Sequence, residues 1–368
     1  MKSNRLMSLD ALRGFDMFFI MGLSGLITAL CAIWPNDVTN ALSQSMTHVW
    51  WDGLHHHDTI FPLFLFLAGV SFPFSYAKSI EKGATRKAVV IKIIKRALIL
   101  VFLGMIYNGL LKFNFENMRY ASVLARIGIA WMFAALLFVR FGVKTRVGIS
   151  IFILVGYALL TKYVGAPDVV GADPLSREGN IVGYIDRLFL PGRLLYNNHF
   201  DPEGLLSAVP AIVTAMLGIF TGELIRVPED RVSGGRKTLY MLTAAVVLAV
   251  VAVVGSGFVP VNKMLWSSTF VCAVGAYSLV LMAVFYYVID VKGYKRWTLI
   301  LRVVGMNSIT IYLAQRIIGF KSITNFFVGG LAGLLPEDWS LVVVQAGYVT
   351  VCWLFLYFLY RKGTFLKV

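Results

Sequence analysis

Charged residues are scarce in this sequence, and their scarcity excludes an ordinary soluble protein. Asp, Glu, Lys and Arg make up 14% of the 368 residues, whereas 58% are hydrophobic. The mean hydropathy is +0.75, while soluble domains carry about 25% charged residues. The apolar stretches are continuous rather than alternating, which favours helices over a barrel. The composition therefore predicts an all-α polytopic membrane protein.

Cysteine is also rare, and the motifs that bind nucleotides are missing. Cys31, Cys272 and Cys352 lie far apart, within or at the edge of apolar stretches. This spacing gives no disulfide framework and no cysteine metal site. The sequence has no Walker-type loop, dinucleotide fingerprint or nucleophile elbow, so nothing supports an ATP-driven or flavin-dependent activity.

Apolar stretches long enough to cross a bilayer, about 20 residues each, recur along the chain. We expect about ten transmembrane helices, over 14–33, 59–77, 97–111, 121–139, 147–163, 205–224, 238–258, 265–289, 298–318 and 341–360. The first continues to Ile33 without a small-residue cleavage site, so we interpret it as a span and not as a signal peptide. The short, glycine-rich stretch 326–335 is typical of a re-entrant or interfacial segment. We expect residues 1–368 to form one transmembrane domain.

The basic residues are distributed unevenly between the loops. The net charge is +15, which in a soluble protein would suggest nucleic acid, but here the charges fall in alternate loops. If all ten stretches cross the membrane, the basic clusters share a side with the N-terminus. They lie at 78–96, 140–146, 226–237, 292–302 and 361–367. By the positive-inside rule we expect both termini to be cytoplasmic and the 164–204 loop to be external, with no nucleic-acid partner.

Three consecutive histidines, His55, His56 and His57, are the obvious candidates for a metal site. They belong to the stretch "THVWWDGLHHHDTIFPLFLFLAG" at the expected outer end of the second span. Consecutive side chains point in different directions, whereas a metal needs several converging ligands. The pattern is more typical of a solvated or interfacial run, with a weak metal site as the alternative, and we predict no metal.

The isolated His48 is the better candidate for chemistry. Two interfacial tryptophans and a glycine turn follow it, and an imidazole in that setting suits general-base work near neutral pH. Asp58 is the nearest residue that could orient it. Asp58 and Thr59 are also suited to cap the following helix, with Pro62 tolerated in its first turn.

Five stretches, in chain order, resemble the heparan-alpha-glucosaminide N-acetyltransferase family of transmembrane acetyltransferases. They are "SLDALRG" (8–14), "HVWWDGLHHHDTIFPLFLFLAG" (48–69), "DPEGLL" (201–206), "NKMLW" (262–266) and "GMNSITIY" (305–312). The resemblance spans nearly the whole chain. It implies transfer of an acetyl group from cytoplasmic acetyl-CoA to the amino group of a glucosamine on the far side of the membrane. In the family pattern, His-x-x-Trp-x-Gly followed by Asp and Phe-Pro carries the active histidine, which falls here on His48.

The resemblance and the charges near the spans together suggest the remaining site residues. The expected substrate-binding residues come from the outer motifs: Trp51, Asp201, Glu203, Asn262 and Lys263. The expected cofactor-binding residues are Arg13, Arg96, Arg126, Arg302 and Asn307. Arg13, Arg96 and Arg302 lie at inner span ends, where they meet CoA phosphates or simply anchor the helices. Asp16 and Arg126 lie inside spans, where charges are costly, and Arg126 holds a ligand or pairs with a carboxylate.

The sequence begins directly at "MKSNRLMSLDALRG", without the luminal N-terminal region of the lysosomal family members. We therefore expect a bacterial-type homologue in a cytoplasmic (inner) membrane, and the lysosomal substrate does not carry over with the resemblance. The expected partners are acetyl-CoA, an amino-sugar or glycan acceptor and the lipid bilayer. Assembly into a homo-oligomer is a further possibility. A membrane sugar O-acyltransferase and a non-enzymatic transporter are the alternatives.

Overall fold

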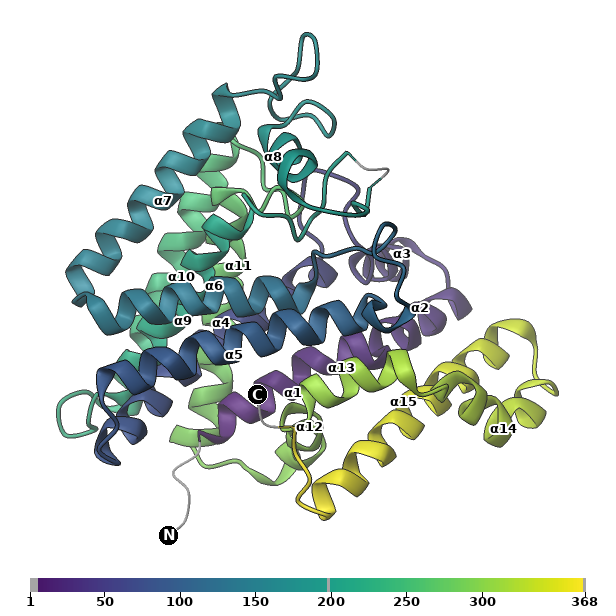
Figure 1. The fold of residues 1–368 in the computed structure, drawn as a ribbon. Helices are drawn as coiled ribbons and strands as arrows, with labels where there is room; N and C mark the ends of the chain where they lie inside the picture. The colour runs from purple at the N-terminus through teal and green to yellow at the C-terminus, as the bar shows by residue number, and fades with distance from the viewer. Residues whose placement is uncertain (1–5, 197–198, 367–368) are drawn as a thin grey trace. The chain divides into compact units, whose positions relative to one another are not determined.

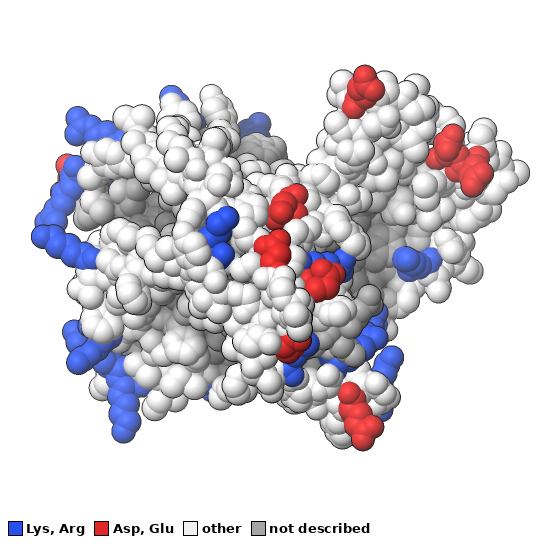
Figure 2. All heavy atoms as spheres, turned by 90° about the horizontal axis from the view of Figure 1, so that it is seen from above, with Lys and Arg blue, Asp and Glu red and all other residues white. Residues whose placement is uncertain are grey.

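The computed structural model describes residues 6–196 and 199–366, and the regular elements in this part of the chain are all helical. Eight of the helices are long and apolar enough to cross a membrane, or nine if one bent pair is counted as a span. These findings confirm an all-α polytopic membrane protein. In the face drawn in Figure 2, uncharged surface predominates and the charged side chains form small separate groups, as expected for such a protein.

The chain divides into two compact units. Unit 1 comprises Met1–Val49, His55–Ile60 and Val284–Lys367. Its helices are α1 (Met7–Phe18), η1 (Phe19–Leu23), α2 (Ser24–Ile33), α3 (Asp37–Ser45), η3 (Tyr286–Val291), η4 (Arg296–Thr298), α12 (Leu299–Gly305), α13 (Ser308–Ile317), α14 (Phe320–Ala332) and α15 (Glu337–Arg361). In Figure 1, α14 and α15 follow one another at the yellow end of the chain, and they pack against each other.

Unit 2 comprises Trp50–Leu54 and Phe61–Ala283. Its helices are α5 (Arg86–Tyr107), η2 (Leu110–Lys112), α6 (Val123–Arg140), α7 (Val143–Tyr163), α8 (Ile181–Phe189), α9 (Ala208–Arg226) and α10 (Gly234–Ser256). Helix α4 (His56–Glu81) begins in unit 1 and continues in unit 2, whereas α11 (Ser268–Phe285) begins in unit 2 and ends in unit 1. Figure 1 shows α5 and α6 lying side by side.

The expected third span, 97–111, corresponds to α5, which is absent from the eight or nine candidate spans. Helix α5 has 22 residues, but Lys92, Lys95 and Arg96 interrupt its apolar sequence. Long basic side chains near a helix end can extend to the membrane surface, so these charges are compatible with a crossing. The other nine expected spans correspond to candidate spans, one of them the bent pair. The sides on which the loops lie depend on whether α5 crosses.

Two of the expected spans are broken, and the breaks occur at small or polar residues. The first span runs from Met7 to Ile33 but contains a π-helical segment in which Gly22 has a φ of 134°. Only glycine adopts this conformation without strain. The ninth span consists of Arg296–Gly305 and Ser308–Ile317, which meet at an angle of 54° around Asn307. Breaks of this kind are typical of functional sites in membrane proteins.

Within unit 1, α1 and α12 cross so closely that only glycine fits at the contact. A Cβ atom on Gly14 would overlap the carbonyl oxygen of Leu301, and one on Gly305 would overlap the carbonyl oxygen of Asp10. Small residues of this kind allow close backbone packing, which is the main source of helix association in lipid. The "SLDALRG" and "GMNSITIY" stretches therefore form one contact.

The core of unit 2 lies among α4, α6, α9 and α11. Trp131, Trp266 and Phe270 fill its centre, and small residues of α6 let the helices approach. A Cβ atom on Gly218 of α9 would overlap the carbonyl oxygen of Phe66 on α4. This core fixes the starts of α6 and α9, where Arg126 and Ser207 are found.

Candidate functional site

His48 and Asp58, the two candidate catalytic residues, form a close pair in unit 1. The Nδ1 atom of His48 lies 2.7 Å from the Oδ1 atom of Asp58. The carboxylate side chain is 1% exposed, whereas the imidazole is 46% exposed. A proton on Nδ1 facing the carboxylate leaves the lone pair of the imidazole on Nε2, which is the arrangement of a general base with an orienting acid.

Asp58 is held by the start of α4 and by the segment that precedes it. Its Oδ2 atom accepts hydrogen bonds from the backbone N–H groups of Val49 (3.2 Å) and His55 (3.1 Å). Helix α4 begins at His56, so Asp58 is in the first turn and not at the N-cap where the sequence suggested it. An acidic residue there satisfies the N–H of the residue before the helix, as in a capping box. This anchoring positions Asp58 against His48.

The three consecutive histidines make three different contacts. The ring of His57 lies 4.5 Å from that of His48, and its Nδ1 is 3.4 Å from the Ser24 hydroxyl. His56 packs edge-on against Phe19, and His55 contacts the carbonyl oxygen of Thr47 at 3.0 Å. No group of three or more His, Cys, Asp or Glu residues suited to a metal is found in residues 6–196 and 199–366.

In unit 2, Asp201 and Glu203 of the "DPEG" motif converge on Arg119. The guanidinium donates to both carboxylate oxygens of Asp201, at 2.6 Å each, and to Glu203. Asp201 is fully buried and also accepts from the backbone N–H groups of Leu195 and Glu203. Because so many groups already bind Asp201, the geometry favours a role in holding Arg119 and the 195–203 segment together over direct substrate contact. Burial opposes the charge of Arg119, but the two carboxylates raise its pKa.

Arg126 lies in α6 and is 1% exposed. Its Nη2 donates to the hydroxyl of Ser207 and, at 3.2 Å, to the carbonyl oxygen of Gly204. The guanidinium carbon lies 4.9 Å from the centre of the Trp266 ring. Its Nε and Nη1 atoms find no hydrogen-bond partner among the described residues. Buried donors are nearly always satisfied, so water or a ligand group is the expected partner.

The "NKMLW" motif forms a turn that binds the "WWDG" segment within unit 2. Asn262 is fully buried, donates to Asp52 at 2.9 Å and accepts from the backbone N–H of Leu265. Lys263 is half-buried in the same turn. The indole of Trp51 donates to the carbonyl oxygen of Leu175 at 2.9 Å. These contacts bring Trp51, Asn262 and Lys263 into one unit, but with structural partners rather than an obvious sugar pocket.

The residues expected to bind acetyl-CoA are divided between the units. Unit 1 holds Arg13, whose guanidinium is 3.9 Å from Asp10, and also Arg302 and Asn307. Asn307 is 2% exposed, and neither polar atom of its amide has a partner in the described part of the chain. Unit 2 holds Arg126 and Arg96, whose guanidinium lies 4.3 Å from the centre of the Trp131 ring. Asn307, at the bend between α12 and α13, is thus the residue of this set most suited to contact a ligand.

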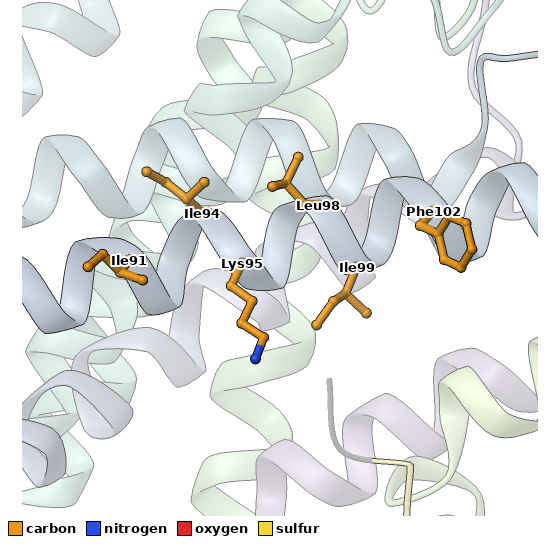
Figure 3. Close-up of a pocket in the computed structure, with 6 residues that line it drawn as sticks. All are labelled: Ile91, Ile94, Lys95, Leu98, Ile99 and Phe102. Carbon is orange, nitrogen blue, oxygen red and sulfur yellow. The ribbon is translucent and has the colours of Figure 1, made fainter.

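A hollow of about 460 Å³ lies on the surface of α5. Figure 3 shows its lining, which consists of residues from α5 alone: Ile91, Ile94, Lys95, Leu98, Ile99 and Phe102. Apolar side chains on the outside of a membrane helix are ordinarily covered by lipid. This hollow therefore says nothing about the acetyl donor.

Asp186 of α8 is a fully buried acid that no sequence motif singled out. It accepts from the backbone N–H of Leu205 at 2.9 Å and of Asp201 at 3.3 Å. Burial raises the pKa of Asp186 to about 6, although these hydrogen bonds and the charge of Arg126 act in the opposite direction. The neutral form therefore persists to a higher pH in the folded protein than it would in an exposed aspartate.

A pH dependence of stability follows from the buried Asp186 of unit 2. The pKa of Asp186 is raised above the value of about 3.9 in an unfolded chain. Its contribution to stability is therefore fully present below pH ~4 and is lost as the pH rises to about 6. We expect the stability advantage of the wild type over Asp186→Asn to shrink across this window, measured as unfolding midpoints in detergent. A difference between the two that grows with pH would contradict this.

Sequence reasoning missed Arg119, Ser207 and Ser24 as well as Asp186. Arg119 precedes Arg126 by seven residues, just before the expected fourth span. Because an arginine at that position needs a partner, its sequence context could have directed attention to the acidic residues of the 164–204 loop. Ser24 and Ser207 carry no signal that separates them from other serines near apolar stretches.

Comparisons with known proteins agree with the motif resemblance. A family described as a domain of unknown function (DUF5009) matches residues 5–155. Heparan-alpha-glucosaminide N-acetyltransferase of Homo sapiens is 27% identical over 385 residues, covering 87% of this chain and 55% of the human protein. The Mus musculus protein of the same name is 26% identical over 386 residues, covering 87% and 56%. The chain spans about half the length of these relatives, to which it is distantly related.

Proposed function

We propose that this chain, similar over most of its length to the N-acetyltransferases above, is itself a transmembrane acetyltransferase. It would move an acetyl group from acetyl-CoA to the amino group of a glucosamine-type sugar. The observation that carries the proposal is the contact between His48 and the buried carboxylate of Asp58, inside the stretch that resembles the family's active-site pattern.

In this reaction the sugar nitrogen attacks the carbonyl carbon of the thioester. A C–N bond forms, the C–S bond breaks, and the products are an amide and free CoA. A glucosamine is largely protonated near neutral pH, so its ammonium group first releases one proton to solvent. The Nε2 atom of His48 then accepts a second proton from the attacking nitrogen, and Asp58 orients the imidazole and stabilises its charged form. This second proton passes to the leaving thiolate.

Acetyl-CoA is a substrate in this proposal, and the chain offers basic and amide groups that suit it. Arginine binds phosphates through paired hydrogen bonds, which suits Arg13, Arg96 and Arg302 to the nucleotide end. Asn307, whose buried amide has no partner among residues 6–196 and 199–366, suits the amide-rich pantetheine arm. Arg126 suits either the arm or the acceptor.

The proposal includes a direction across the membrane. With α5 as a crossing helix, both termini lie in the cytoplasm and the 164–204 loop lies outside, because the basic clusters then all face inward. The membrane in question is the cytoplasmic (inner) membrane, with acetyl-CoA supplied from the cytoplasm and the sugar from the external side.

The test uses the purified chain in sealed vesicles. Labelled acetyl-CoA is added on one side, a panel of amino sugars is enclosed on the other, and the acetylated product is identified. Labelled N-acetyl product supports the proposal, and its dependence on which side receives acetyl-CoA reports the direction. Acetylation of a hydroxyl would indicate a sugar O-acyltransferase instead. Passage of a sugar or of acetyl-CoA through the membrane without acetylation would indicate a transporter.

A further inference from the structure

Helix α5 is buried along one face only. The buried residues recur every three or four positions, as residues on one face of a helix do: Val89, Ile93, Ala97, Leu100 and Gly104. This face packs against α6, where a Cβ atom on Gly128 would lie 3.0 Å from the carbonyl oxygen of Ala97. Because α6 covers only this face, the opposite side of α5 is left exposed.

The exposed side of α5 carries the hollow of about 460 Å³, whose lining forms a stripe along the helix (Figure 3). We call its six residues the α5 stripe: Ile91, Ile94, Lys95, Leu98, Ile99 and Phe102. Five of the six are apolar, and each of these five is more than a third exposed. In a membrane protein, an exposed apolar stripe is a surface for the acyl chains of lipids.

The basic residues of α5 are confined to its first half. Lys95 belongs to the α5 stripe, and the exposed Lys92 and Lys87 precede it by about one and two helical turns. The second half of the helix, from Ala97 to Tyr107, contains no charged residue. No carboxylate of residues 6–196 and 199–366 forms an ion pair with the three lysines. The exposed side of α5 is therefore cationic at one end and apolar at the other.

We propose that the α5 stripe binds an anionic phospholipid, with the phosphate group at Lys92 and Lys95 and an acyl chain along the apolar half of the stripe. This inference goes beyond acetyl transfer and does not depend on it. Lysine ammonium groups attract anionic headgroups, and their long stems follow an apolar surface to reach them. A zwitterionic lipid carries an ammonium group of its own beside the phosphate, so the two lysines favour a lipid with net negative charge.

A second copy of the chain is the other occupant that an exposed apolar stripe suggests, and the lysines argue against it. Two copies in one membrane have the same orientation across it. A symmetric contact between two α5 stripes therefore places Lys92 and Lys95 of both copies at the same depth. Like charges that face each other repel, most strongly where water is scarce. A phosphate group has the opposite charge and gains from the same lysines.

The test measures lipid binding by the intact purified protein. Native mass spectrometry in detergent compares phosphatidylglycerol with phosphatidylcholine of the same acyl chains. The wild type should bind phosphatidylglycerol more tightly, and added salt should weaken this preference. In Lys92→Ala/Lys95→Ala, the affinity for phosphatidylglycerol should fall about 10- to 30-fold, with that for phosphatidylcholine nearly unchanged. Lys92→Arg/Lys95→Arg should keep most of the affinity, because both charges remain.

Arg140→Ala/Lys144→Ala provides the control. These exposed residues lie at the adjoining ends of α6 and α7, so the variant loses the same charge away from the α5 stripe. An equal loss in this variant, or unchanged phosphatidylglycerol binding in Lys92→Ala/Lys95→Ala, would overturn the inference. Equal binding of the two lipids by the wild type would do so without any variant. A dimer that dissociates in Leu98→Ser without release of lipid would assign the stripe to a second copy of the chain.

Discussion

Replacing His48 with alanine is expected to reduce acetyl transfer by about 10³-fold, because the substitution removes the imidazole that accepts the proton from the attacking nitrogen. The buried carboxylate of Asp58, 2.7 Å from His48 Nδ1, would then have no imidazole to orient. The measurement is the rate of acetylation of an amino sugar by purified protein. Folding and CoA binding should change little, because the His48 side chain is 46% exposed.

The matched control is His55→Ala. His55 lies in the same segment as His48, immediately before helix α4, and it is also a histidine. Its contribution to Asp58 is made by the backbone N–H, which alanine retains, and its ring only contacts the Thr47 carbonyl. We expect this variant to stay within a few-fold of the wild type. Replacement of His55, His56 and His57 together is expected to leave substantial activity, with some loss because His57 packs against His48. If the triple variant is inactive and His48→Ala is active, the catalytic group lies in the histidine run.

The same proteins can distinguish two chemical routes. If His48 is a general base, the acetyl group passes directly to the sugar and both substrates must be bound together. If His48 attacks first, an acetyl-imidazole forms and the kinetics become ping-pong. Incubation with labelled acetyl-CoA alone should leave label on the wild type only in the second case.

The largest loss of stability is expected for Arg119→Ala, at about 3–5 kcal/mol. The substitution leaves Asp201 with no exposed surface and without its cation, and it also removes the partner of Glu203. An uncompensated buried charge is costly, whereas a paired one is tolerated. The measurement is the unfolding midpoint in detergent, which should fall by several degrees, together with faster proteolysis of the 164–204 loop.

Asp168→Ala provides the comparison for this variant. It also removes an arginine–carboxylate pair of the 164–204 loop, but the Asp168 side chain is 41% exposed, and exposed pairs contribute little. Its unfolding midpoint should stay close to that of the wild type. Similar midpoints for Arg119→Ala and Asp168→Ala would mean that the contacts of Arg119 with Asp201 and Glu203 do not stabilise the protein.

The features predictable from sequence are those with a strong local signal. Long apolar stretches predicted the helices, and one motif predicted that His48 and Asp58 lie together, because the two residues are only ten apart and flank a helix start. The start of α4 was placed three residues late, since a histidine at the first helical position carries no capping signal. An apolar stretch alone does not predict whether helix α5 crosses the membrane, because three basic residues interrupt its sequence.

Long-range pairing between loops was not predictable. Arg119 meets Asp201 across 82 positions of the chain, and Trp50 meets Arg177 across more than a hundred. No periodicity relates such residues, since their partners depend on how the helices between them pack. The π-helical break at Gly22 has a similar origin: glycine permits the conformation, but it does not specify it.

The close crossing of α1 and α12 also restricts how these helices can move. Moving α1 by one turn, about 5.4 Å, would bring Asp10 or Phe18 to the position of Gly14, against the Leu301 carbonyl where even a Cβ atom does not fit. Rotation about the crossing point keeps both glycines in contact and meets no such obstacle. The pair therefore acts as a pivot, which permits scissoring of α1 against α12 but not sliding, and any opening at this end of unit 1 has to follow that one motion.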